Sequence, residues 1–357
     1  MMNWTNELTR KLKTDFPIIQ APMFGVTTPE MVASAAKTGC LGSLPLGDLP
    51  PDKCAELIRA TKQLSRRPFT VNLFANEIPE VTYALQARYE ATKQFIQSLA
   101  QQHGIEVVLP DFAELSVKSY HEQVDAILAE NCKVVSFTFG NLDNQVIQKF
   151  KDNDITTIGT CTSLQEAQIL ENAGIDIICV QGIEAGGHRG SFAKNYLPEI
   201  GGISLFSQVY EAVNVPLIYA GGISNAKTLL AARTLGAQGF QIGSLLLGSA
   251  ESALRAFEKE KLRKVTESEI VLTRSFSGRY ARGIRNAFIE AVENTEYILP
   301  YPYQNKLTTA LRKASKAHEN LDFVSIWVGQ SITDYSSLST SEILENLIAA
   351  TEKESHR

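Results

Sequence analysis

The stretch "VPLIYAGGISNAKTLLAARTLGAQGFQIGS", residues 215–244, contains a complete strand–helix–strand unit. Its two ends, residues 215–223 and 237–244, are runs rich in apolar residues that finish in glycines, and a helical pattern separates them. Continuous apolar strands are typical of a parallel sheet that is covered on both faces. The stretch therefore predicts βα units joined into a parallel sheet.

The same unit recurs on the N-terminal side of this stretch. Eight apolar runs of strand length follow one another with helical patterns between them, at residues 17–23, 40–47, 69–74, 133–140, 155–162, 175–182, 215–223 and 237–244. Eight βα units in roughly 250 residues favour a closed (β/α)8 TIM barrel over an open, doubly wound sheet. No G-x-G-x-x-G follows the first run, so the dinucleotide fingerprint of a Rossmann fold is missing.

Two segments fall outside this regular alternation. Residues 76–131 are too long for a connection, and "ALQARYEATKQFIQSLAQQHG" and "HEQVDAILAENC" within them have helical spacing. Residues 251–357 are also mainly helical in pattern. We expect this insertion and the C-terminal segment to form a cap and substrate region over one face of the barrel, which residues 1–75 and 132–250 would form.

Composition excludes several classes of function. The chain of 357 residues has a net charge of -5, without the clustered basic residues that nucleic-acid binding needs. It contains neither an apolar stretch of about 18 residues nor the apolar core of a signal peptide, so we expect a cytoplasmic protein with no membrane partner. We expect it to be a monomer or a homodimer. Its five cysteines form no C-x-x-C pair and indicate no metal site.

Glycines follow the last two predicted strands, where a barrel of this type carries its phosphate site. Gly221 and Gly222 end the seventh strand, and Gly243 and Ser244 end the eighth. Glycine lets the backbone approach a ligand closely, and the free N–H groups of such loops favour an anion. Either pair alone is typical of a tight turn, but the two together predict a ligand that carries a phosphate.

A histidine lies in a glycine-rich loop after the sixth strand, in "QGIEAGGHRG", residues 181–190. Gly186 and Gly187 leave room for a flat ring against the backbone and place His188 above the mouth of the barrel. The alternative is a histidine that only satisfies a neighbouring group. Asn72 and Gln181, also at strand ends, can read the heteroatom edge of a ring, although a turn-capping role stays open for Asn72.

Eight segments in order resemble the class I nitronate monooxygenases, formerly called 2-nitropropane dioxygenases. They are "QAPMFGVTTPEM", "GCLGSLPLGD", "FTVNLF", "VQGIEAGGHRGSF", "PLIYAGGIS", "GFQIGSLLL", "FSGRYARGIRNAFI" and "YPYQNKLTTALRKA", between about residues 17 and 331. The motif "EAGGHRG" alone is shared with FMN-dependent enoyl reductases. The resemblance implies a TIM barrel with non-covalently bound FMN.

The resemblance also implies the site residues. The active-site histidine would be His188, and Tyr301, Tyr303 and Lys306 would line the substrate cavity. The FMN contacts would be Met23, Asn72, Gln181, Gly186, Gly222, Gln241, Ile242, Gly243 and Ser244. The implied reaction oxidises an alkyl nitronate, such as propionate 3-nitronate, with O2 to a carbonyl compound and nitrite. His188, with Lys306, would supply hydrogen bonds or positive charge to the nitro oxygens, or His188 would act as a base toward neutral nitroalkanes.

Two alternatives to this function stay open: an FMN-dependent NAD(P)H oxidoreductase of the enoyl reductase type, and a flavin-binding protein without turnover. Thr138 stands in "VSFTFG" where many members of the family have a histidine, which bears on the substrate range more than on the reaction class. Arg279, Arg282 and Arg285 lie close together in sequence. They either attract an anionic substrate or, as we prefer, fix the C-terminal segment to the barrel.

Overall fold

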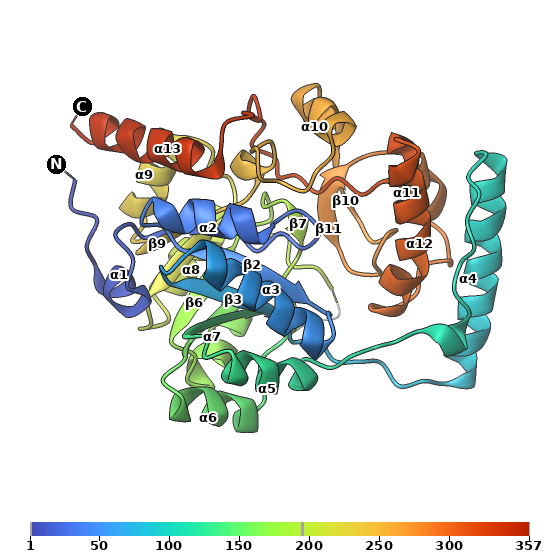
Figure 1. The fold of residues 1–357 in the computed structure, drawn as a ribbon, viewed down its shortest axis with the longest axis horizontal. Helices are drawn as coiled ribbons and strands as arrows, with labels where there is room; N and C mark the ends of the chain where they lie inside the picture. Colours follow the sequence, from blue (N-terminus) through green and yellow to red (C-terminus); the bar gives the residue numbers. More distant parts are fainter. Residues whose placement is uncertain (1, 194–195, 357) are drawn as a thin grey trace.

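The structure, a computed structural model that describes residues 2–193 and 196–356, is built on a barrel of parallel strands (Figure 1). In pairing order the eight-stranded sheet contains β1 (Ile18–Gln20), β9 (Gly239–Ile242), β8 (Leu217–Ala220), β6 (Ile177–Gln181), β5 (Thr156–Cys161), β4 (Val134–Thr138), β3 (Phe69–Phe74) and β2 (Gly42–Gly47). A parallel bridge between Ile19 and Leu41 brings its two edges together. The expected TIM barrel and its eight strands are therefore confirmed.

Helices surround the barrel and bury its outer face. They are α2 (Pro29–Lys37), α3 (Pro51–Leu64), α5 (His121–Ala129), α6 (Asn144–Asp152), α7 (Leu164–Asn172), α8 (Gly202–Tyr210), α9 (Ala226–Thr234) and α13 (Thr340–Glu354). One cluster of buried apolar side chains from these helices and from the strands forms the main core. The first of these helices begins after Thr28, because the Thr28 side chain accepts a hydrogen bond from Met31 N at 3.1 Å and Pro29 occupies the first helical position.

The N-terminal helix closes one end of the barrel. Helix α1 (Glu7–Leu12) places Leu8 and Leu12 in a buried cluster with strand residues that include Ile19, Ile177 and Ile218. These strand residues lie at or near the starts of their strands. The opposite end, where the strands finish, is therefore the end at which loops can form a site.

A second apolar cluster lies beside the barrel. It joins α4 (Tyr83–Gln102), α11 (Ala287–Val292) and α12 (Tyr303–Ala317), and in Figure 1 the last two helices lie between α4 and a small antiparallel sheet. That sheet has the order β10 (Ile270–Thr273), β11 (Ala281–Ile284) and β7 (Gly187–His188). The remaining elements are α10 (Ala256–Arg263) and the short 3-10 helices η1 (Phe112–Glu114), η2 (Ser244–Leu246), η3 (Glu267–Glu269) and η4 (Leu321–Phe323).

The two predicted cap segments are divided between the barrel core and the second apolar cluster. Val124 and Ile127 of α5, within residues 76–131, belong to the same buried core as the barrel strands. Ile343 and Leu344 of α13, near the C-terminus, also belong to that core. An amphipathic helix shows in its sequence that it has an apolar face but not which surface this face covers. A cap domain with those boundaries therefore stays a prediction. Among the helices of the described ranges, none combines the length and apolar character of a membrane span.

Candidate active site

The two glycine loops lie next to each other because β8 and β9 pair directly. Gly221 has φ +118° and Gly222 has φ +69°, a backbone region that favours glycine. In the described part of the chain, no acceptor faces the backbone N–H of Gly222 or of Ser244. Unpaired N–H groups on adjacent loops make a suitable site for an anion.

The neighbouring side chains leave space at this point. A Cβ atom built on Gly243 would meet only Ala21 Cβ at 3.5 Å and Met23 Sδ at 3.9 Å, so the end of β1 faces the same opening. Ser244 Oγ accepts a hydrogen bond from Gly329 N at 2.9 Å, and no described residue accepts the proton of that hydroxyl. The hydroxyl therefore has a proton to offer a ligand oxygen. Ile242 is fully buried in the core and can contribute only its backbone.

The loop after β6 is held in place by the last residue of that strand. Gln181 Nε2 donates to His188 O at 3.0 Å, and Gln181 Oε1 accepts from Gly190 N at 2.9 Å. Gly190 also packs on the end of β4, because a Cβ atom there would lie 2.9 Å from Thr138 Oγ1. Gln181 thus fixes the histidine loop through two hydrogen bonds, and Thr138 packs against the same loop at the end of β4.

Residues 327–331, the crossing segment, pass over the glycine loops. A Cβ atom on Gly186 would lie 2.5 Å from Gly329 N, so close backbone packing requires glycine at position 186. Ser331 Oγ donates to Gly222 O at 3.1 Å, and the Trp327 ring centroid lies 5.3 Å from that of His188. The crossing segment therefore links the two glycine loops to the histidine.

His188 lies on β7, opposite Ala281 of β11. Its Nε2 is 2.8 Å from Ser277 Oγ, and its ring centroid is 5.6 Å from that of Phe139. Burial, with the positive charges of Arg279 and Arg312, lowers the pKa of His188 to about 3. The imidazole is therefore neutral at physiological pH.

A buried hydroxyl and a guanidinium group lie beside this imidazole. Tyr301 is buried among Phe74 and Phe139, and its hydroxyl has no partner in the described ranges. The guanidinium of Arg279 lies 4.4 Å from the ring centroid of Phe139 and 6.0 Å from that of Tyr301, within cation–π range. Burial lowers the pKa of Arg279 to about 10, so this side chain stays charged at neutral pH.

The other predicted substrate residues have partners within the protein. Lys306 Nζ forms an ion pair with Asp48 Oδ2 at 2.5 Å, near the end of β2. Tyr303 donates its hydroxyl to Pro79 O at 3.1 Å and stacks on Phe112, in the contact between α12 and the α4 region. The structure therefore places Tyr303 in a packing interface, whereas Tyr301 lies beside the histidine.

Two predicted cofactor residues lie at strand ends around the mouth. Asn72 is buried in β3 and donates Nδ2 to Ser136 Oγ of β4 at 2.9 Å. Gln241 lies near the end of β9 and is partly exposed. The histidine loop, both glycine loops and the ends of β1, β3 and β9 therefore meet at one end of the barrel, although Asn72 already has a partner within the sheet.

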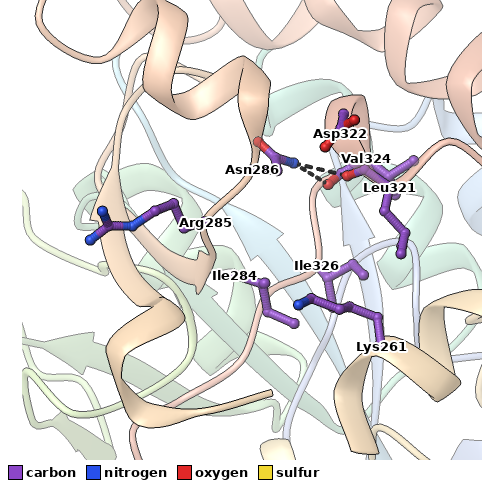
Figure 2. Close-up of a pocket in the computed structure, with 8 residues that line it drawn as sticks. All are labelled: Lys261, Ile284, Arg285, Asn286, Leu321, Asp322, Val324 and Ile326. Atoms are coloured by element: carbon purple, nitrogen blue, oxygen red, sulfur yellow. Dashed lines mark hydrogen bonds between the residues drawn. The ribbon is translucent and has the colours of Figure 1, made fainter. Parts of the chain in front are cut away.

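The arginines near residue 280 have different positions. Arg279 donates to Ser191 O, and Arg282 Nε donates to Ile183 O at 3.0 Å, so both fix the loop after β6 through its carbonyl groups. Arg285 lies by a separate cavity of about 200 Å3, where its side chain points away from Asn286 (Figure 2). The structural interpretation fits Arg282, whereas Arg279 also faces the site. A second cavity, of about 370 Å3, lies between α8 and α9 and reaches Gly222.

Sequence patterns do not indicate three side chains of this region: Ser277 and Arg312, which lie near His188, and Asp48, which lies near Tyr301 and Lys306. Ser277 is 89 positions from His188 in the chain, and the pairing of β7 with β11 brings it close. No sequence pattern connects such distant residues, although "FSGR" marks a turn at this position. In the described ranges, no group of three or more His, Cys, Asp and Glu side chains is placed to hold a metal ion.

Comparisons with known proteins show the family and the fold of the chain. A family model described as "Nitronate monooxygenase" matches residues 5–350. A "Probable nitronate monooxygenase" of Staphylococcus saprophyticus is 35% identical over 351 residues, which are 97% of this chain and 98% of the relative. The solved nitroalkane oxidase from Streptomyces ansochromogenes superposes with a TM-score of 0.88 at 31% identity and covers 98% of this chain and 99% of its own. FabK from Thermotoga maritima, with a TM-score of 0.77 at 24% identity over 99% of this chain and 97% of its own, shares the fold.

Proposed function

The chain belongs to the nitronate monooxygenase family, and from this premise we propose that it oxidises alkyl nitronates with O2 to carbonyl compounds and nitrite, using FMN. The observation that carries the proposal is the placement of a neutral imidazole, an unpartnered tyrosine hydroxyl and a charged guanidinium group at the open end of the barrel. His188, Tyr301 and Arg279 supply these three groups.

The residues at the barrel mouth fit FMN. Gly222 and Ser244 offer unpaired backbone N–H groups, and the Ser244 hydroxyl offers a proton, so they would hold the phosphate. Met23 borders the glycine loop at Gly243, since a Cβ atom built on Gly243 would lie 3.9 Å from Met23 Sδ, so it would lie next to the bound FMN. When bound, FMN would accept electrons from the nitronate and transfer them to O2.

Recognition of the anion falls to Arg279 and Tyr301. The family resemblance implies that His188, with Lys306, supplies positive charge or hydrogen bonds to the nitro oxygens. However, Lys306 is paired with Asp48, and burial keeps His188 neutral. The guanidinium of Arg279 and the free hydroxyl of Tyr301 are available instead, and both are suited to an oxyanion.

The low pKa of His188 favours nitronates over neutral nitroalkanes as substrates. A base accepts a proton efficiently when its pKa is near the working pH, and the pKa of His188 is lowered to about 3. Removal of a proton from a neutral nitroalkane is therefore slow at this site. A nitronate has already lost that proton and needs only to be bound and oriented.

The test combines spectroscopy with oxygen uptake. Purified protein should show the absorption of bound FMN, and it should consume O2 rapidly with propionate 3-nitronate or ethyl nitronate but slowly with freshly dissolved nitroethane. The same protein mixed anaerobically with NADH or NADPH should stay oxidised. Fast bleaching by either nucleotide without nitronate-dependent O2 uptake would support the enoyl reductase type instead, and bound flavin with neither activity would support a non-catalytic flavin protein.

A further inference from the structure

We infer that Ser277 is a positioning residue that fixes the tautomer of His188, so that the imidazole donates its Nε2–H to Ser277 Oγ and keeps Nδ1 unprotonated. The hydrogen bonds of Ser277 make Nε2 the donor, and burial and the neighbouring arginines keep the ring neutral. Its catalytic meaning, an acceptor nitrogen facing the substrate, rests on the proposed function.

The hydroxyl of Ser277 has three neighbours and a single proton. Ser277 Oγ lies 3.0 Å from Arg279 O, 3.3 Å from Arg279 N and 2.8 Å from His188 Nε2. A carbonyl oxygen can only accept and an amide N–H can only donate, so the hydroxyl gives its proton to Arg279 O. The imidazole is then the remaining donor.

The opposite tautomer leaves more groups without a partner. If Ser277 donated to Nε2, Arg279 O would lose the one donor that the described residues offer it, and Nδ1–H would have no acceptor among them. An unpaired N–H is rarer in buried sites than an unpaired acceptor. The Nε2–H tautomer leaves only the Nδ1 lone pair free.

Packing keeps the imidazole against Ser277. Ser277 is buried on the turn between β10 and β11, and His188 pairs with Ala281 in the next strand segment. The rings of Phe139 and Trp327 contact the imidazole edge to face, with interplanar angles of 74° and 61°. The ring therefore has little freedom to turn Nε2 away from the hydroxyl.

The charged groups around the ring keep it neutral, so that it has a single N–H. Arg279 on the turn before β11 and Arg312 on α12 are cationic and oppose a second proton, and burial acts in the same direction. Tyr301, which precedes α12, is uncharged because burial raises its pKa. In consequence, Arg279 and Tyr301 bind an oxyanion, while the unprotonated Nδ1 of His188 accepts a hydrogen bond.

The first test measures the tautomer directly. Holoenzyme labelled with 15N-histidine is studied by long-range 1H–15N correlation, and the variant His188→Asn identifies the signals of His188 among the five histidines. We expect a protonated Nε2 and an unprotonated Nδ1 throughout pH 5 to 8. A protonated Nδ1 in the neutral ring would overturn the inference without any effect on the proposed function. A cationic ring would overturn the inference and would also contradict the neutral imidazole on which the proposed function rests.

The second test removes the hydroxyl. Ser277→Ala should give a mixture of tautomers and lower kcat/KM for a nitronate about tenfold, the expected effect of one lost hydrogen bond, and Ser277→Thr should restore both. Ser275→Ala is the matched control, because that buried hydroxyl donates to Glu293 Oε2 at 2.7 Å, whereas His188 Nε2 is hydrogen-bonded to Ser277. The control should lower the melting temperature but leave the tautomer and kcat/KM unchanged. Wild-type tautomer signals in Ser277→Ala would show that the hydroxyl has no positioning role.

Discussion

Gly222→Asp tests the proposal that the loop after β8 holds the phosphate of FMN. A Cβ atom at this position would meet Glu184 Cγ at 3.4 Å and Ser331 Oγ at 3.8 Å, which are ordinary contacts, so the side chain has room. The backbone φ of +69° costs a non-glycine residue about 1 kcal/mol. Gly222→Ala carries that cost without a charge and is the matched control.

The added carboxylate should release the cofactor. Two unit charges about 4 Å apart repel by about 4 kcal/mol at an effective dielectric constant of about 20, and a phosphate carries more than one charge. The dissociation constant of FMN should therefore rise by at least about 1,000-fold in Gly222→Asp. The purified variant should be colourless, whereas Gly222→Ala should stay yellow.

The assay is the absorption spectrum of each purified variant, followed by calorimetric titration of the apoprotein with FMN and a denaturation curve to confirm folding. Stoichiometric flavin in a folded Gly222→Asp variant would refute the placement of the phosphate at this loop. Equal loss of flavin from Gly222→Ala would show that backbone strain, and not charge, is responsible.

Three other perturbations test the histidine loop. Gly186→Ala should lower the free energy of unfolding by about 1–3 kcal/mol, because its Cβ would lie 2.5 Å from Gly329 N. The Cβ of Gly187→Ala would have no atom within 4 Å, so this variant should lose only about 1 kcal/mol, the cost of its positive φ. Urea unfolding of both variants measures the difference. The pKa of His188 is lowered from 6.5 to about 3, so the unfolded chain binds the extra proton first, and stability should fall by about 1.4 kcal/mol per pH unit as the pH drops below 6.5. His188→Asn should flatten this slope, and an unchanged slope would contradict the low pKa. Glu166→Gln should lower the free energy of unfolding by about 2–3 kcal/mol and slow nitronate turnover. This buried carboxylate accepts hydrogen bonds from the backbone N–H groups of residues 162, 192 and 193, which hold the histidine loop. Wild-type stability of the variant would contradict that role.

Much of the fold follows from local sequence signals. Parallel strands that are buried on both faces read as continuous apolar runs, so each barrel strand is visible in its own residues. The first barrel helix, α2, begins at Thr28 and Pro29, which are typical residues for the N-cap and the first helical position. The positions of Gly222, Gly243 and His188 then follow from topology, because the C-terminal ends of parallel strands meet at one end of a barrel.

The hydrogen-bond and ion-pair partners of the site side chains could not be predicted from the sequence. The residues "YPYQNK" place Tyr301, Tyr303 and Lys306 together, yet the structure leaves the first hydroxyl free, gives the second to Pro79 O and pairs the lysine with Asp48. A hydroxyl or ammonium group binds whichever partner the fold brings within about 3 Å, and that partner here lies far away in the chain.

Local sequence signals were enough to predict the barrel, the end at which a site would lie, and the glycine loops and histidine of the candidate site, because strand periodicity, backbone freedom and topology are encoded locally. The packing of α5 and α13 on the barrel, the close contact of Gly186 with the crossing segment, and the hydrogen bond between His188 and Ser277 are visible only in the folded chain. These features depend on contacts between segments that are distant in the sequence, and such contacts form and contribute stability only in the folded chain.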